Sequence, residues 1–305
     1  MSLFATLKGA GPSGFGYGST AEQVSAGLNL KGKTMLVTGC NSGLGFETTR
    51  VLTMRGARVI GLARTVDKAE RAGAQVNGEV LPVACELSEP ASVRAAILRV
   101  KELGHSLDVI ICNAGIMALP KLKQRHGYEL QFFTNHIGHS ILVLGLLDQL
   151  SDDGRVVVLS SAAHRGAPRS GIEFDNLSGE RGYSSWKMYG QSKLANLLFA
   201  KELALRLMGS KKTVYAIHPG VIHTNLARHM GGVVNAAMAV VKPLVLKSVA
   251  QGAATQVYCA VHPDAPQNNG EYWADCNVAR TSRHGRDGAL AKRLWQETER
   301  IIAAV

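Results

Sequence analysis

The sequence predicts an α/β fold: one domain with a doubly wound parallel sheet and helices on both of its faces. Between Lys33 and Gly220, six short apolar runs alternate with segments of helix length. The runs are apolar at successive positions, as in strands buried on both faces, and the segments between them have helical periodicity. No low-complexity linker or internal repeat follows residue 30. A strand–helix alternation of this kind is typical of a doubly wound sheet.

The elements follow in a simple order. Residues 1–30 begin rich in Gly and Ser and hold no apolar run of strand length, so we expect an N-terminal arm before a domain over 31–305. The expected strands lie in TMLVTG (34–39), ARVIGLA (57–63), EVLPVA (79–84), DVIICNAG (108–115), RVVVLSS (155–161) and TVYAIHPG (213–220). The expected helices cover 44–55, 91–103, 127–150 and 186–208.

Composition excludes several classes of protein. The 305 residues are 46% hydrophobic, enough for a substantial core, so global disorder is excluded. With 34 basic and 23 acidic residues the net charge is +11, but the basic patches at 211–212 and 280–286 lack interleaved aromatic residues, so we expect no nucleic-acid partner. No apolar stretch reaches the ~18 residues of a membrane span. Five scattered cysteines without a CxxC pattern argue against disulfides and a metal site, and favour a cytoplasmic protein.

A glycine-rich turn follows the first expected strand. In TGCNSGLG (38–45), Gly39 permits a tight turn, Gly43 permits close approach of a pyrophosphate, and Gly45 permits the helix to pack on the strand. The first N–H groups of the helix, with their partial positive charge, would face the phosphates. A plain strand-to-helix turn is the alternative, but the strand before and the amphipathic helix after favour a nucleotide site. The turn contributes Gly39, Asn41, Ser42, Gly43, Leu44 and Gly45.

The residue after the second expected strand bears on cofactor choice. An acidic side chain there would accept a hydrogen bond from the ribose 2′-hydroxyl of NAD and repel the 2′-phosphate of NADP. The chain has Arg64 at this position, and its first acid is Asp67. A guanidinium can bind a phosphate in bidentate fashion, so the sequence favours NADP over NAD. A solvated surface arginine is the alternative.

Candidate catalytic residues gather at strand ends and on one helix. Tyr189 and Lys193 are four residues apart, so they share a helix face, where a lysine beside a phenol favours the phenolate and acid/base chemistry. The pair alone is weak evidence, because such spacing arises often by chance. Its weight comes from Ser160-Ser161 at the end of the fifth expected strand, Asn113-Ala114-Gly115 at the end of the fourth, and Asn135 in the following helix. Carboxyl ends of parallel strands are where doubly wound folds bind ligands.

At this point the chain resembles the short-chain dehydrogenase/reductase family. TGCNSGLG, CNAG, TNHIGH, LSS, YGQSK and HPGVIHT occur in the family's order, and the resemblance covers Lys31 to at least Thr224. It implies a Rossmann-like sheet of about seven strands and NAD(P)-dependent alcohol/carbonyl chemistry. It also implies that Tyr189 is the general acid/base, that Lys193 lowers its pKa and holds the nicotinamide ribose, and that Ser161 binds the substrate carbonyl. Asn135 would anchor a water-mediated proton relay.

The resemblance implies further cofactor contacts. Pro219, Gly220, Val221 and Thr224 would line the nicotinamide, Asn113, Ala114 and Gly115 would lie beside the cofactor, and Glu86 and Leu87 would contact the adenine. Two departures are visible, since Glu86 replaces the family's usual Asp and Cys112 replaces the first Asn of its NNAG motif. Further stretches, among them QGAATQVY and YWADCN, resemble the retinol-dehydrogenase-like branch.

Two features outside these motifs have simple interpretations. His136 and His139 are three residues apart but have no carboxylate pattern beside them, so we interpret them as core histidines rather than metal ligands. The apolar segment at about 225–247 directly follows the nicotinamide-lining residues, and we expect a lid over an apolar substrate there, with a surface helix pair as the alternative.

The function expected from the sequence is an oxidoreductase that transfers hydride between NADP(H) and a small hydrophobic alcohol, ketone or aldehyde. The resemblance adds a homodimer or homotetramer. The alternative is a non-catalytic nucleotide-sensing or scaffold protein that keeps the fold. Such a protein would have no need to retain Ser161, Tyr189 and Lys193 together with Asn135.

Overall fold

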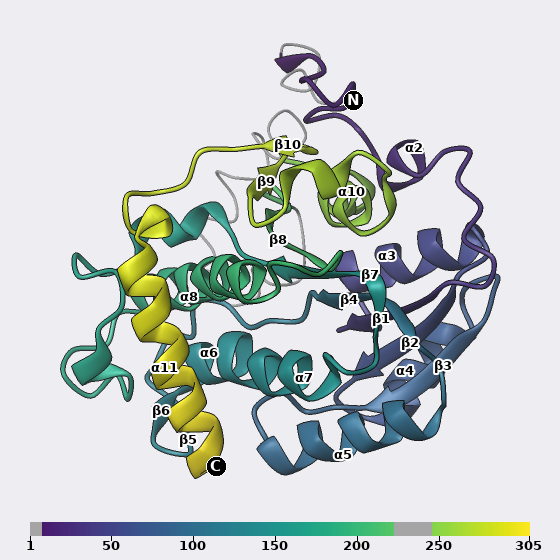
Figure 1. The fold of residues 1–305 in the computed structure, drawn as a ribbon. Helices are drawn as coiled ribbons and strands as arrows, with labels where there is room; N and C mark the ends of the chain where they lie inside the picture. The colour runs from purple at the N-terminus through teal and green to yellow at the C-terminus, as the bar shows by residue number, and fades with distance from the viewer. Residues whose placement is uncertain (1–7, 223–245) are drawn as a thin grey trace.

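The computed structural model describes residues 8–222 and 246–305, and its centre is a mostly parallel sheet (Figure 1). The described part of this sheet has eight strands in the order β10-β9-β8-β7-β4-β1-β2-β3. All neighbours are parallel except β9 and β10. The strands are β1 (Thr34–Thr38), β2 (Arg58–Ala63), β3 (Val80–Ala84), β4 (Leu107–Cys112), β7 (Leu150–Leu159), β8 (Thr213–His218), β9 (Tyr272–Ala274) and β10 (Asn277–Val278).

Helices cover both faces of the sheet, as the sequence predicts (Figure 1). One face carries α5 (Pro90–Glu102), α6 (Leu130–Phe132), α7 (Gly138–Leu146), α8 (Ser185–Arg206) and α11 (Gly288–Ala304). The other carries α2 (Ala21–Val24), α3 (Gly43–Met54) and α10 (Val249–Val261). Helix α4 (Val66–Gly73) packs beside β2 and β3. Single 3-10 turns lie at η2 (Ala162–Gly166), η3 (Phe174–Asn176), η5 (Ala265–Asn268) and η6 (His284–Arg286).

The strands are apolar at successive positions because each has two buried faces. In β1, Leu36 joins the core under α5, α7 and α8, whereas Met35 and Val37 join the core under α3 and α10. All five residues of β1 are buried. Alternate side chains of one strand therefore belong to different hydrophobic cores, which is why the expected strands have no polar face.

The predicted helix over 127–150 is wrong at both ends. Its first residues form a small hairpin of β5 (Gln124–Arg125) and β6 (Tyr128–Glu129), in which Gly127 has a positive φ of 82°. The helix begins only after Glu129, whose carboxylate accepts a hydrogen bond from the backbone N–H of Phe132 at 2.9 Å. A π-helical turn, η1 (Phe133–Ile137), then leads into α7, and β7 begins at Leu150.

Two parts of the chain add to the predicted domain. Short strands β9 and β10 bring the sheet to eight strands, one more than the roughly seven that the resemblance implies. The described part of the N-terminal arm packs against the domain, since Tyr17, Ala21 and Val24 are buried. The Asn277 side chain fixes the arm to β10, because it donates to the Phe15 carbonyl at 3.0 Å. Within residues 8–222 and 246–305, no helix has both the length and the apolar character of a membrane span.

Candidate active site

The predicted site residues come together at the carboxyl edge of the sheet. The strand order reverses between the adjacent strands β1 and β4, which opens a crevice at their carboxyl ends. Gly39 follows β1, Asn113 follows β4, and the two carboxyl-end turns after β7 and β8 begin near Ser161 and Pro219. Segments that are distant in the sequence therefore meet at one edge.

The glycine-rich turn after β1 has the geometry of an anion site. Gly39 and Gly43 have positive φ angles of 69° and 53°. A Cβ atom on Gly45 would overlap the Gly39 carbonyl oxygen, so the turn can close only with glycine at this position. Residues 41–43 are exposed, and the Ser42 side chain makes no capping hydrogen bond with the described residues of α3. The first N–H groups of α3 are thus open to a phosphate, and the turn fits the pyrophosphate of a dinucleotide.

Asn113 and Ala114 join the ends of β4 and β1. The Asn113 side chain donates to the Thr38 carbonyl at 2.8 Å. The backbone N–H groups of Asn113 and Ala114 donate to the Thr38 hydroxyl at 2.9 and 3.0 Å. Gln256 of α10 adds a longer contact, 3.4 Å from its Nε2 to the Asn113 Oδ1. Thr38 is the first residue of the TGCNSGLG motif, and Gln256 lies in the QGAATQVY stretch, to which the resemblance assigns no role.

The residues expected near the adenosine lie at the ends of β2 and β3. Arg64 comes directly after β2, is exposed, and has no ion pair or hydrogen bond from its side chain within the described residues. The Glu86 carboxylate accepts from the N–H and hydroxyl groups of Ser88 at 3.3 and 3.0 Å. Leu87 is buried, and its carbonyl lies against Gly138. Arg64 is therefore available to an anionic ligand, while Glu86 is part of a local turn.

Tyr189 and Ser161 bring two hydroxyl groups together. Tyr189 lies in the first turns of α8, and its side chain is 9% exposed. Burial raises the pKa of the Tyr189 phenol to about 12, and a hydrogen bond with the Ser161 side chain acts in the opposite direction. Ser161 begins the η2 turn, where its hydroxyl also accepts from the Ala163 N–H at 3.2 Å.

Lys193 is one helical turn after Tyr189 and is deeply buried. Its Nζ atom donates to the Leu159 carbonyl at 2.9 Å and lies 5.8 Å from the centre of the Tyr189 ring. Asn196 donates to the same carbonyl at 3.0 Å, a contact that no sequence pattern predicts. Burial lowers the pKa of Lys193 to about 8. Burial thus dominates the pKa of Tyr189 among the described residues, and the lowering by Lys193 that the resemblance implies stays a prediction.

Both the oxygen and the nitrogen of the Asn135 side-chain amide are hydrogen-bonded. Its Oδ1 accepts from the Ile116 N–H at 2.8 Å, and its Nδ2 donates to the Ile116 carbonyl at 2.9 Å and to the Ser192 hydroxyl at 3.0 Å. Ser192 in turn donates to the Tyr189 carbonyl at 2.8 Å. Gly115 lies close to this amide, since a Cβ there would be 3.0 Å from the Asn135 Oδ1, a tight contact, and 3.6 Å from the Lys193 Nζ.

The turn after β8 is braced by an ion pair that the sequence does not predict. Gly220 has a positive φ of 92° and packs against the stem of Lys247. The Lys247 side chain is fully buried, and its Nζ lies 2.6 Å from the Asp275 Oδ1. Pro219 is buried, Val221 is exposed, and Thr224 and most of the expected lid, 225–245, lie outside the described residues.

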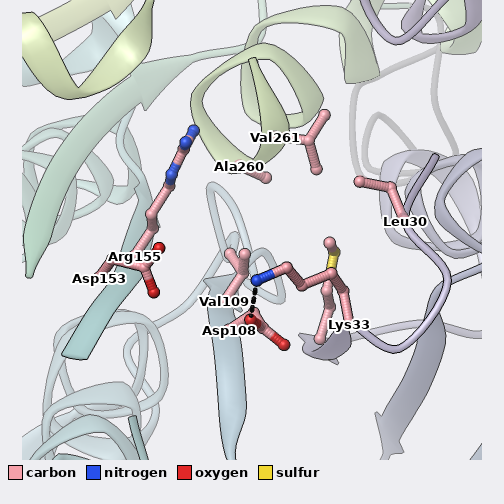
Figure 2. Close-up of a pocket in the computed structure, with 9 residues that line it drawn as sticks. Leu30, Lys33, Asp108, Val109, Asp153, Arg155, Ala260 and Val261 are labelled. Atoms are coloured by element: carbon pink, nitrogen blue, oxygen red, sulfur yellow. Dashed lines mark hydrogen bonds and ion pairs between the residues drawn. The ribbon is translucent and has the colours of Figure 1, made fainter. Parts of the chain in front are cut away.

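A small cavity of about 90 Å³ lies away from these residues (Figure 2). Its lining includes Lys33 and Asp108, which form an ion pair at 2.8 Å near the amino ends of β1 and β4. This is the sheet edge opposite the candidate site, and none of the predicted site residues lines it. No group of three or more His, Cys, Asp or Glu residues that could hold a metal occurs in the described parts of the chain.

Comparisons with known proteins point in one direction. A family model described as short chain dehydrogenase matches residues 33–231. The short-chain dehydrogenase TIC 32 B, chloroplastic, of Brassica napus is 40% identical over 99% of both chains. Retinol dehydrogenase 12 of Mus musculus is 39% identical over 88% of this chain and 85% of its own. The crystal structure of an uncharacterized protein from Mycobacterium paratuberculosis has a TM-score of 0.76 and 34% identity, covering 94% of this chain and 98% of the other.

Proposed function

The chain belongs to the short-chain dehydrogenase family, and we propose that it transfers hydride between NADP(H) and a hydrophobic alcohol/carbonyl pair, with Tyr189 as the general acid/base. Membership makes the chain one of a family of oxidoreductases. The cofactor preference, the substrate class and the residue roles are the proposal. The observation that carries it is the meeting of the Ser161 hydroxyl and the Tyr189 phenol beside Lys193, at the sheet edge that holds the glycine-rich turn.

The described residues fit a dinucleotide cofactor. The open N–H groups of α3 suit its pyrophosphate. Glycine at position 115 puts no side chain next to Asn135 and Lys193. When bound, the nicotinamide supplies or accepts the hydride. The ammonium of Lys193 is suited to hold the ribose hydroxyls next to it.

The side chains then have distinct tasks in carbonyl reduction. Ser161 donates a hydrogen bond to the substrate oxygen and orients it toward Tyr189. The Tyr189 phenol, kept protonated by its raised pKa, donates its proton to that oxygen as negative charge develops there. Lys193 lies beside the phenol ring and Asn135 contacts the next turn of α8 through Ser192, so both are placed to serve proton replacement. In alcohol oxidation the same phenol must first lose its proton, so oxidation is favoured at high pH.

Arg64 supports NADP over NAD. Its exposed guanidinium follows β2, at the strand end where a doubly wound fold binds the adenosine ribose, and the first acidic residue, Asp67, lies inside α4. A free guanidinium can form two parallel charge-assisted hydrogen bonds with a 2′-phosphate.

Exposed apolar side chains beside the reacting hydroxyls support a hydrophobic substrate. The Trp186 ring is 50% exposed and makes an edge contact with the Tyr189 ring, with 6.1 Å between their centres. Val221, after the β8 turn, is 60% exposed. Large apolar groups of this kind are the usual lining of sites for apolar ligands.

The test is NADPH oxidation by the purified protein with a panel of aldehydes and ketones of increasing apolar surface. The proposal expects turnover that rises in kcat/KM with apolar surface and that is weaker with NADH. NADPH binding without turnover of any carbonyl, or of any alcohol with NADP, would instead favour the nucleotide-sensing alternative.

A further inference from the structure

Two buried histidines, His136 and His139, have different partners although they are neighbours on one helical segment. The His136 Nε2 pairs with the Thr298 hydroxyl of α11 at 2.8 Å, on the side away from the glycine-rich turn. The His139 ring lies between two parts of the active site. Its Nδ1 is 2.9 Å from the Asn135 carbonyl, and its Nε2 is 2.9 Å from the Thr38 hydroxyl.

The tautomer of His139 follows from its partners. A carbonyl oxygen can only accept, so the proton is on Nδ1 and points to Asn135. The ring is 1% exposed, and burial lowers its pKa to about 4, so it is neutral at pH 7 and Nε2 is an acceptor. The Thr38 hydroxyl has two possible acceptors, the His139 Nε2 at 2.9 Å and the Ile111 carbonyl at 3.4 Å, and the shorter contact directs its hydrogen to Nε2.

The direction of the Thr38 hydroxyl matters because both of its lone pairs are in use. They accept from the backbone N–H groups of Asn113 and Ala114. With its hydrogen directed to His139, every hydrogen-bonding capacity of the hydroxyl is satisfied. The hydrogen bonds thus form one oriented chain, from the Asn135 carbonyl through His139 and Thr38 to the end of β4.

The Asn135 carbonyl belongs to a π-helical part of the backbone. The η1 turn is π-helical, and the Gly138 N–H bonds to the Phe133 carbonyl five residues earlier. A π-helical turn displaces backbone hydrogen bonds from their α-helical partners and is common at functional sites. From the first turn of α7, the His139 ring donates to the Asn135 carbonyl of this turn. Lys193 is close enough that its charge contributes to the lowered pKa of His139.

We propose that His139 is a positioning residue that couples Asn135 to the cofactor-binding turn through Thr38. The inference rests on the proposed function, in which Asn135 acts behind Tyr189. Loss of the ring would release the Asn135 carbonyl and the Thr38 hydroxyl together, so cofactor binding and proton transfer would weaken together. His136, equally buried and on the same segment, provides a control whose closest partner, the Thr298 hydroxyl, is on α11, while its ring also interacts with Asn196 of α8.

The experiment compares His139→Asn and His136→Asn for NADPH affinity, followed by tryptophan fluorescence, and for kcat of carbonyl reduction. His139→Asn is expected to raise the Kd for NADPH by about tenfold and to lower kcat by about tenfold. His136→Asn is expected to change each quantity by less than about twofold. Equal effects of the two substitutions would show a merely structural role and overturn the proposal. The Kd comparison needs no turnover, so it remains decisive even if no carbonyl is reduced and the proposed function fails.

Variants of Thr38 give a second test of the proposal, which can be used even if His139→Asn does not fold. Thr38→Ser keeps the hydroxyl and is expected to retain NADPH affinity and kcat, whereas Thr38→Val loses them to the same degree as His139→Asn. The double variant Thr38→Val/His139→Asn should lose no more NADPH affinity and kcat than the more damaging of the two single variants, because both substitutions break the same chain of hydrogen bonds. Effects that multiply, or a Thr38→Val variant with normal affinity and kcat, would contradict the coupling.

Discussion

The Ser160 hydroxyl donates a hydrogen bond to the backbone carbonyl of Lys193 at 2.7 Å. This contact joins the end of β7 to the interior of α8, and Ser160 is 1% exposed. Its neighbour Ser161 is partly exposed, and its side chain lowers the pKa of the Tyr189 phenol against the effect of burial. Two adjacent serines therefore have different surroundings, and we propose that Ser160 serves the packing of α8 while Ser161 serves the reaction.

Replacing Ser161 should damage catalysis without damaging cofactor binding. Ser161→Ala removes the hydroxyl that we propose to bind the substrate oxygen, so kcat/KM should fall by about a hundredfold or more, roughly 3 kcal/mol of transition-state stabilisation. The Kd for NADPH should remain within about twofold. Steady-state kinetics and fluorescence titration measure both quantities.

Ser160→Ala is the matched control for that experiment. It removes the buried hydrogen bond to the Lys193 carbonyl, so it should lower the free energy of unfolding by about 1–3 kcal/mol. The loss in kcat/KM should be smaller than for Ser161→Ala. If Ser160→Ala is the more damaging to kcat/KM, the assignment of the two serines is wrong.

Arg64→Ala should remove most of the preference for NADPH. The side chain is exposed and has no ion-pair partner in the described residues, so its loss leaves the fold intact. The wild-type protein is expected to bind NADPH at least about tenfold more tightly than NADH, through a charge-assisted contact with the 2′-phosphate. Calorimetric titration with both cofactors gives the ratio. An unchanged ratio in Arg64→Ala would exclude Arg64 as the phosphate ligand.

The pH dependence of carbonyl reduction should follow the loss of charge on Lys193. Burial lowers the pKa of this ammonium to about 8 and raises the pKa of the Tyr189 phenol to about 12. Between pH 6 and 10 the phenol therefore stays protonated, whereas Lys193 loses its charge above about pH 8. We expect kcat/KM for reduction to be level at low pH and to fall above about pH 8, because kcat/KM reports groups of the free enzyme.

Lys193→Arg tests this interpretation of the profile. A guanidinium stays charged through pH 10, so the decrease in kcat/KM near pH 8 should disappear. The level value of kcat/KM should be lower than in the wild type, because the geometry of the group differs. A decrease at the same pH in the variant would assign the titration to another residue.

Trp186→Ala should weaken the binding of apolar substrates more than that of polar ones. The half-exposed ring next to Tyr189 offers apolar area that a hydrophobic carbonyl would bury, so KM should rise by about tenfold for such substrates and much less for small polar ones. Leu205→Ala is the control, since Leu205 is 56% exposed at the other end of α8. Equal changes in KM for polar and apolar carbonyls would contradict a substrate contact.

The fold could be predicted where burial leaves a local pattern. Strands with two buried faces are continuous apolar runs, and all six expected runs contain strands of the sheet. Strands β9 and β10 were missed because three and two residues are too short for a period to appear. The start of the helix after Glu129 is decided by a turn and a cap rather than by apolar periodicity.

The site could be predicted only in part for the same reason. The glycine-rich turn and the Tyr189–Lys193 spacing are local, and the resemblance to the family, now shown, rests on such motifs. The contacts of His139 with Thr38 and of Lys247 with Asp275 join residues far apart in the sequence. No local pattern records such pairs, because they form only when the sheet brings distant strand ends together.

The central claim is that Tyr189 donates the proton to the carbonyl that takes up the hydride, and Tyr189→Phe tests it most directly. The substitution removes one hydroxyl and keeps the ring that packs against Trp186. The measurement is the single-turnover rate of NADPH oxidation at saturating carbonyl, together with the Kd for NADPH. We expect the rate to fall by about a thousandfold or more with the Kd within about twofold. A variant that binds NADPH normally and keeps more than about a tenth of the wild-type rate would contradict the account.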